Sequence, residues 1–300
     1  MELWIPITIA AAFFQNLRSA LQKHLKGRLS THGATYARFV YAVPFVALYT
    51  AVLAGPGNAP VPTPSLPFVC YTVAGGSAQI VATFLLIHLF SYRNFAVGTT
   101  YSKTETVPTA IFGILILGDR LHPLAAGGII VSLIGVMLMS AGRGPTSVRT
   151  LFTAWSERPA LIGIASGACF GISIVSYRAA SLSLQGTTYL MQAATTLLCA
   201  TVFQTVAMGI WMRLRELGEV TRVIRTFRVG VWVGVSGMLA SACWLTAATL
   251  QNAAYVRVVG QIELLFMFAA SMLFFHERPG WLEVLGIVLV AAGIVLLLLA

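Results

Sequence analysis

The amino-acid sequence predicts an all-α, polytopic membrane protein with ten transmembrane helices, built as two inverted repeats of five helices each. Three observations predict this fold: few charged residues, ten long apolar segments, and polar residues that recur between the two halves. Of the 300 residues, 58% are hydrophobic and only 9% are charged. Soluble domains are about a quarter charged, so a water-soluble chain of this composition would expose large apolar patches and aggregate.

The apolar segments have the length of membrane spans. A spanning helix needs about 20 mostly apolar residues, and the segments that meet this requirement are 3–24, 31–54, 67–91, 95–117, 123–141, 159–182, 186–211, 229–250, 254–275 and 280–299. Four of them have proline in the first turn, where its missing N–H costs no hydrogen bond, at Pro67, Pro123, Pro159 and Pro279. Pro44 and Pro108 lie inside spans and are expected to kink them. Gly163, Gly167 and Gly171 recur every four residues, which predicts close helix packing.

The basic residues are distributed unequally between the loops. One set of alternate loops has only Arg120. The other set has Lys23, Lys26, Arg28, Arg93, Arg143, Arg149, Arg158, Arg213, Arg215, Arg222, Arg225, Arg228 and Arg278. Basic loops stay in the cytoplasm, so we expect a multi-pass protein of the cell (inner) membrane with both termini on the non-cytoplasmic side. The segment 211–228 mixes arginine with apolar residues and predicts either a short helix on the membrane surface or a solvated connector.

The two halves of the chain are related by an internal repeat. A shift of 158 residues superposes the pairs Asn94 and Asn252, Glu105 and Glu263, Asp119 and Glu277, and Arg120 and Arg278. A slightly different shift matches Arg18 with Arg178. The repeats are predicted at 1–141 and 159–300, with 142–158 as a cytoplasmic linker. Because five spans is an odd number, the second half must be inverted in the membrane, an arrangement typical of transporters.

Two stretches carry a family resemblance. They are Pro108–Leu121 followed by Gly128–Val136, and Phe274–Pro279 followed by Gly286–Ile294. Both resemble the closing segment of an EamA repeat, so the chain resembles the drug/metabolite transporter (DMT) superfamily over nearly its whole length. The resemblance implies a ten-helix transporter, often an exporter of amino acids or related metabolites. Two departures are Asp119, where the family usually has glutamate, and Phe266, at the position equivalent to Pro108.

Two carboxylates lie near the middle of predicted spans, where charges are costly and usually functional. Glu105 and Glu263 occupy equivalent positions in the two repeats, and we expect both to face a central cavity. One hypothesis gives them a direct role in cargo binding and proton coupling. The other makes them structural partners of Arg18 and Arg178, in two symmetric ion pairs.

Charged residues without an equivalent in the other repeat are better candidates for cargo binding, because symmetry of the scaffold does not explain them. They are Arg38 and His88 towards the cytoplasmic end, Lys103 near the middle of the membrane, and Arg257 towards the other end. Further candidates for cargo contacts are Tyr101, Gln261 and Trp244. His88 is a candidate proton relay or a satisfied core histidine, and Arg257 is a ligand or extends to the headgroups. Tyr101 and Gln261 either bind the cargo or join neighbouring helices, and Trp244 either stacks against a ring of the cargo or belongs to the aromatic belt at the membrane interface.

The predicted function is secondary transport, with export as the expected direction. The spans hold five Lys or Arg residues and two Glu, which favours a small anionic or zwitterionic cargo such as an amino acid or its derivative. A lipid flippase is the alternative, and a membrane-embedded enzyme is disfavoured because no metal-holding cluster of acids and no nucleophile motif is present. The sequence has no phosphate loop, so the chain is not expected to drive transport with ATP. We expect no cofactor, metal or nucleic acid. The expected partners are the cargo, membrane lipid and protons, with the chain a monomer or homodimer.

Overall fold

The computed structural model describes residues 2–55, 59–89, 91–92, 101–142, 157–266, 268 and 280–300. This part of the chain is helical and has no strand, which confirms the predicted all-α class. Its helices are α1 (Trp4–Lys26), α2 (Thr31–Val40), α3 (Val43–Leu53), α4 (Leu66–Leu89), η1 (Lys103–Glu105), α6 (Thr106–Leu117), α7 (Pro123–Gly142), α9 (Arg158–Ser183), α10 (Tyr189–Arg215), α11 (Glu219–Arg225), α12 (Phe227–Leu250), α13 (Ala253–Gly260) and α15 (Trp281–Leu298). Asn94, Glu277, 274–279 and most of the predicted linker, 143–156, lie outside the described residues.

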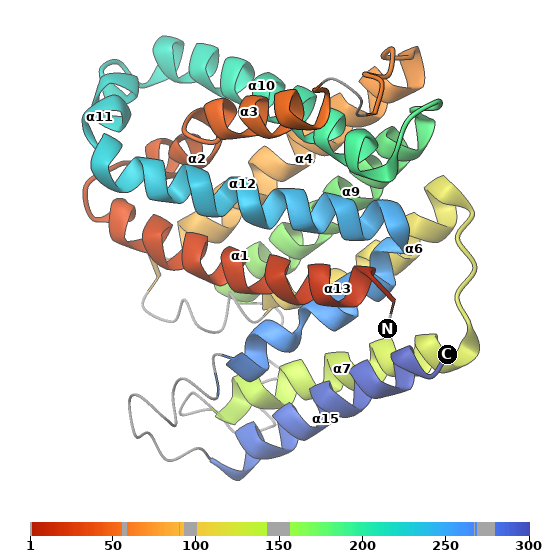
Figure 1. Cartoon of the computed structure of the whole chain (residues 1–300). Coiled ribbons are helices and arrows are strands. Elements are labelled where there is room, and N and C mark those ends of the chain that lie inside the picture. Colours follow the sequence, from red (N-terminus) through yellow and green to blue (C-terminus); the bar gives the residue numbers. More distant parts are fainter. Residues whose placement is uncertain are drawn as a thin grey trace.

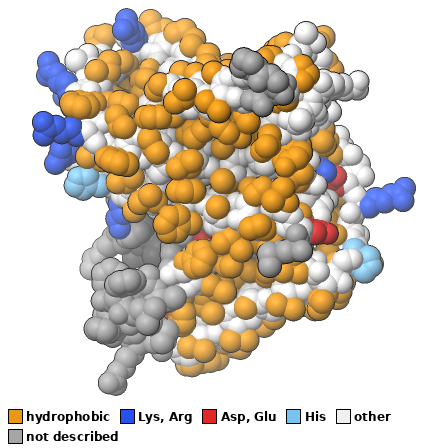
Figure 2. All heavy atoms as spheres, in the orientation of Figure 1, with side chains coloured by type: hydrophobic (Ala, Val, Ile, Leu, Met, Phe, Trp, Pro, Cys, Tyr) orange, Lys and Arg blue, Asp and Glu red, His pale blue; other side chains and the backbone are white. Residues whose placement is uncertain are grey.

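The helices have the lengths and composition of membrane spans. Six helical stretches in the described part are long and apolar enough to cross a membrane, and 123–139 is a shorter apolar one. Most helices run in roughly the same direction or its reverse, and both chain ends lie at one end of the bundle (Figure 1). Figure 2 shows hydrophobic side chains over the visible face, with Lys and Arg gathered at the edge where α11 lies. That edge includes the basic last turns of α1 and α10.

Three predicted spans contain a break. The predicted span 31–54 is divided into α2 and α3, and Pro44 stands in the first turn of α3, in agreement with the expected kink. Before α6, residues Lys103–Glu105 form a 3-10 turn that ends three residues before Pro108. At the equivalent place in the second repeat, α13 ends at Gly260 and Gln261 is in a turn. Both repeats therefore interrupt the helix that holds their intramembrane glutamate.

The helix pairs follow the repeat. α1 packs along α12, and their equivalents α9 and α4 pack along each other in the same way. α7 packs along α15, its own equivalent. A Cβ atom at Gly135 would lie 2.6 Å from the Gly286 carbonyl oxygen, and one at Gly128 would lie 2.7 Å from that of Gly293. Gly128 is equivalent to Gly286 and Gly135 to Gly293, so the two contacts are the same contact seen from either repeat, with the helices antiparallel.

The predicted glycine ridge of α9 also lies at a close contact. A Cβ atom at Gly167 would lie 2.7 Å from the carbonyl oxygen of Ser102, and one at Gly171 would lie 2.9 Å from the backbone nitrogen of Thr109. α9 therefore touches the backbone of η1 and α6 directly. The contact includes Glu105, whose backbone nitrogen would lie 3.2 Å from the same Cβ atom at Gly167.

Candidate functional site

Two ion pairs join the repeats at the breaks in their helices. Arg257 of α13 donates a hydrogen bond from Nη1 to the Glu105 carboxylate at 3.1 Å. Lys103 of η1 forms an ion pair with Glu263. The cation of the first ion pair, Arg257, belongs to the second repeat, and the cation of the other, Lys103, belongs to the first. Glu105, Arg257 and Glu263 are all buried, whereas the Lys103 side chain remains 23% exposed.

These partners differ from the repeat-matched arginines expected from the sequence. Arg178 donates two hydrogen bonds from Nη1 to Asp119, at 2.7 and 2.8 Å. Its carboxylate partner is placed by Gly118, which ends α6 with φ of +66° and lets the Asp119 N–H bond back to the Gly113 carbonyl. Arg178 thus belongs to an ion pair, but with Asp119 instead of a glutamate. Within the described part of the chain, Arg18 forms no ion pair and no hydrogen bond.

A small polar network surrounds the two ion pairs. Gln15 of α1 donates an amide hydrogen bond to Glu263 at 3.2 Å and accepts one from the Trp244 indole at 2.9 Å. The Arg257 guanidinium lies over the Trp244 ring, 4.5 Å from its centroid, a cation–π contact. Trp244 therefore lies beside both ion pairs. Gln15 was not predicted, although an amide three residues before Arg18 in an apolar span was a signal for it.

Two small cavities lie beside this network, with volumes of about 10 and 20 Å³, room for about one water molecule each. Arg38 and Gln79 line both, and Arg257 and Trp244 line the second. Arg38 donates a hydrogen bond to the Thr83 hydroxyl at 2.7 Å. The sequence placed Arg38 and Arg257 towards opposite ends of the bundle, but both side chains reach the same cavity. Long, flexible arginine side chains make the position of the Cα atom a poor guide to that of the charge.

Hydrogen-bonded polar side chains also occur on α4, α9 and α10 near these cavities. The Gln204 amide donates to Gln79 at 2.9 Å and to the Tyr177 hydroxyl at 3.0 Å, and Tyr177 donates to Gln79 at 3.1 Å. Gln79 and Tyr177 line the second cavity, and Gln79 and Gln204 line the first. These side chains therefore add hydrogen-bonding groups to the walls of both cavities.

Of the predicted site residues, only Arg38, Arg257 and Trp244 line the two cavities. Lys103, Glu105 and Glu263 lie in the ion pairs and line neither cavity, and three others also lie away from the cavities. Tyr101 is buried. Gln261 accepts a hydrogen bond from the Ser132 hydroxyl of α7, so it joins helices. His88 lies on α4 in an aromatic row, stacked on Phe84 with ring centroids 5.9 Å apart. The described geometry does not place His88 with the two glutamates.

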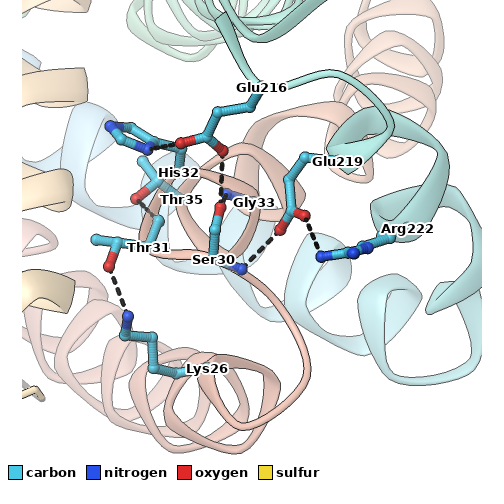
Figure 3. Close-up of polar contacts among 9 residues, drawn as sticks. All are labelled: Lys26, Ser30, Thr31, His32, Gly33, Thr35, Glu216, Glu219 and Arg222. Carbon is cyan, nitrogen blue, oxygen red and sulfur yellow. Dashed lines mark hydrogen bonds and ion pairs between the residues drawn. The ribbon is translucent and has the colours of Figure 1, made fainter.

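A second polar cluster ties the start of α2 to the turn between α10 and α11. Figure 3 shows Glu216 and Glu219 pointing towards Ser30 and His32. The Ser30 backbone N–H donates to Glu219 at 2.6 Å, its hydroxyl donates to Glu216 at 2.9 Å, and His32 hydrogen-bonds Glu216. Gly33 leaves room for this arrangement, because a Cβ atom there would lie 2.4 Å from the Glu219 carboxylate. Both carboxylates belong to the second repeat, and their negative charge lies at the positive N-terminal end of the α2 helix dipole in the first repeat.

We expect Glu219→Ala to lower the free energy of unfolding by about 1–3 kcal/mol, because it leaves the partly buried Ser30 N–H without its acceptor. The matched control is Arg222→Ala. Arg222 is bonded to the same carboxylate at 3.3 Å, but its side chain is 71% exposed, and such pairs contribute little. Thermal unfolding in detergent measures both variants, and equal effects would assign the stabilisation to the exposed ion pair instead.

Comparison with known proteins covers nearly the whole chain. The EamA-like transporter family matches residues 2–141 and 158–299. A solved structure described only as "Crystal structure of protein" superposes with a TM-score of 0.68 over 99% of this chain and 96% of that chain, at 15% sequence identity. At that identity the likeness shows the fold. A search of curated proteins finds none that match.

Proposed function

We propose, from the premise that this chain belongs to the EamA-like transporter family and is a membrane transporter of the drug/metabolite type, that it exports a small anionic or zwitterionic metabolite by alternating access. The observation that carries this proposal is the pair of reciprocal ion pairs, Arg257 with Glu105 and Lys103 with Glu263, beside polar cavities between the repeats. Interrupted helices at the middle of inverted repeats are typical sites for cargo in secondary transporters.

The transmembrane arrangement is part of the proposal. We take the chain to cross the inner membrane ten times, as two inverted repeats at 1–141 and 159–300 joined by 142–158. The antiparallel, symmetry-related contact of α7 and α15 supports inversion. The basic residues at one end of the bundle support a cytoplasmic location for that end and a non-cytoplasmic location for both termini.

The ion pairs suggest how cargo is recognised. The cavities hold about one water molecule each, so cargo enters only when the repeats separate. Separation would break both ion pairs, because each joins one repeat to the other. A cargo carboxylate would then replace a glutamate beside Lys103 or Arg257, and a cargo ammonium would replace a cation beside Glu105 or Glu263. Each buried charge would keep a counterion, which avoids the large cost of an unpaired charge.

Transport by the purified protein tests this function. Proteoliposomes are loaded with unlabelled amino acids and acidic metabolites, and uptake of labelled compounds is measured with and without a pH gradient. We expect saturable exchange of at least one anionic or zwitterionic compound. Lipid scrambling in the same vesicles without transport of any compound would favour a flippase and reject the carrier.

Lys103→Ala is expected to abolish transport while the protein stays folded and inserted. The variant removes a positive charge beside the cavities, but Lys103 is partly exposed and Glu263 keeps its hydrogen bond from Gln15. Because Glu263 then keeps a buried charge without its cation, some stability should be lost, but less than for the buried Arg257, and folded protein should still be recovered while transport is lost. Uptake in proteoliposomes and the elution profile in detergent measure the two effects. Wild-type transport by the variant would remove Lys103 from the cargo site.

Glu105→Gln is expected to remove the effect of a pH gradient on transport while cargo still binds, if Glu105 exchanges a proton during the cycle. The amide keeps an oxygen that accepts the Arg257 hydrogen bond, but it does not take up a proton. Uptake at several gradients and ligand binding in detergent measure these properties. Loss of folded protein would instead assign Glu105 a structural role.

A further inference from the structure

Two buried arginines take no part in the ion pairs. Arg18 and Arg38 expose only 3% and 4% of their surface. Among the described residues, neither has a carboxylate oxygen within the 4.0 Å that defines an ion pair. Within the described ranges, the one hydrogen bond of the Arg38 side chain is to the neutral Thr83 hydroxyl, and the buried Arg18 Nε has no hydrogen-bond partner. A buried charge without a counterion carries a large free-energy cost, which a bound anion would offset.

The two arginines are neighbours, and Arg38 lines both cavities. A Cβ atom at Gly237 of α12 would lie 3.5 Å from Cδ of Arg18 and 3.7 Å from Cγ of Arg38. Gly237 and Arg38 line the first cavity, and Arg38 and Arg257 line the second. An anion between the repeats would therefore contact Arg38 and have Arg18 beside it.

We infer that Arg18 and Arg38 form an anion subsite and that the cargo is a dianion, either a dicarboxylate or a phosphate compound. This inference rests on the proposed transport function and deepens it. Lys103 and Arg257 are each paired with a glutamate, so those two pairs are neutral. The other two cations leave two positive charges, which a cargo with two negative charges neutralises and a zwitterion does not.

Arg18 has one competing partner elsewhere in the chain. The repeat equates Arg18 with Arg178 and Glu277 with Asp119, and Arg178 binds Asp119. Glu277 lies outside the described residues. The two assignments predict opposite effects of removing Arg18. Loss of a paired arginine leaves a carboxylate without a partner and destabilises the protein, whereas loss of an uncompensated cation does not.

Thermal unfolding of the whole protein in detergent separates the two assignments. The probes are succinate, inorganic phosphate and the monoanion propionate, at equal ionic strength. For the wild type, we expect succinate or phosphate to raise Tm, and propionate to raise it less. The dianion that raises Tm shows whether the cargo carries two carboxylates, like succinate, or a phosphate group. For Arg18→Gln and Arg38→Gln, we expect an unchanged or higher Tm without probe, and at least about a tenfold loss of apparent affinity for the dianion. The exposed Arg120→Gln is the control and should behave as the wild type.

The outcomes that reject the subsite are specific. A fall in the Tm of Arg18→Gln without probe, with Glu277→Gln restoring it in the double variant, would assign Arg18 to a structural pair. Equal stabilisation by propionate and the dianions would remove the second charge from the cargo. Exchange of monovalent or zwitterionic compounds alone in proteoliposomes would also overturn the dianion, while the transport function would stand. Failure of all exchange would reject the transport function itself.

Discussion

Replacing Arg257 with glutamine is expected to lower the free energy of unfolding by about 3–5 kcal/mol, because Glu105 then keeps a buried charge without a cation. The substitution also removes the guanidinium from the face of Trp244, a contact worth about 0.5–2 kcal/mol in proteins. Transport should be lost as well, since Arg257 lines the second cavity. Few other single substitutions in the bundle remove so much at once.

The double variant Arg257→Gln with Glu105→Gln is the matched control. It removes both charges of the pair, so most of the lost stability should return even though the hydrogen bond is weakened. Thermal unfolding of the wild type, the two single variants and the double variant gives the coupling energy of the pair. If the two single effects simply add, Arg257 and Glu105 do not depend on each other, and the ion pair is not the source of the stability.

The two intramembrane carboxylates were easier to single out from the sequence than the residues they contact. Glu105 and Glu263 stand out because acids are rare inside apolar spans and these two recur at the repeat spacing. Their partners, Arg257 and Lys103, do not recur, so the repeat alone suggested Arg18 and Arg178 instead. Equivalent positions in two repeats share an environment, but an ion pair across the interface depends on side-chain reach and on where each helix breaks.

Local backbone geometry decided the pairing of Arg178. Asp119 reaches that arginine because Gly118 adopts a left-handed conformation at the end of α6. A glycine after an apolar helix is a recognisable signal for such an ending, so the turn was predictable. Its consequence was not, because the sequence does not say that the end of α6 lies beside α9.

The contacts at the start of α2 were also beyond the reach of sequence patterns. The sequence predicts a surface helix or a solvated connector at 211–228, and α11 occupies part of this segment. Nothing in that pattern indicated that Glu216 and Glu219 would bind Ser30, which is more than 180 residues away in the chain. Periodicity and composition describe a helix and its exposed face, whereas contacts between distant loops depend on how the whole bundle packs.

The second large loss of stability is expected from substitutions where α7 and α15 cross. We expect Gly135→Ala to destabilise the protein by about 1–3 kcal/mol, since its Cβ atom would lie 2.6 Å from the Gly286 carbonyl oxygen and 2.7 Å from the Val290 nitrogen. Both atoms belong to the backbone and do not move aside as a flexible side chain does. Gly135→Leu should prevent the two helices from packing and remove most folded protein.

Gly127→Ala on the same helix is the control for this substitution. A Cβ atom at Gly127 meets nothing within 4 Å, so alanine there should raise stability by about 0.5–1 kcal/mol through its better helix propensity. Thermal unfolding and the yield of monodisperse protein compare the two variants. Because the repeat relates Gly135 to Gly293, Gly293→Ala should cost about as much as Gly135→Ala: a Cβ atom at Gly293 would lie 2.7 Å from the Gly128 carbonyl oxygen. A neutral effect of Gly135→Ala would mean that α7 and α15 separate easily, and the close, symmetric crossing would then not be what holds the two repeats together.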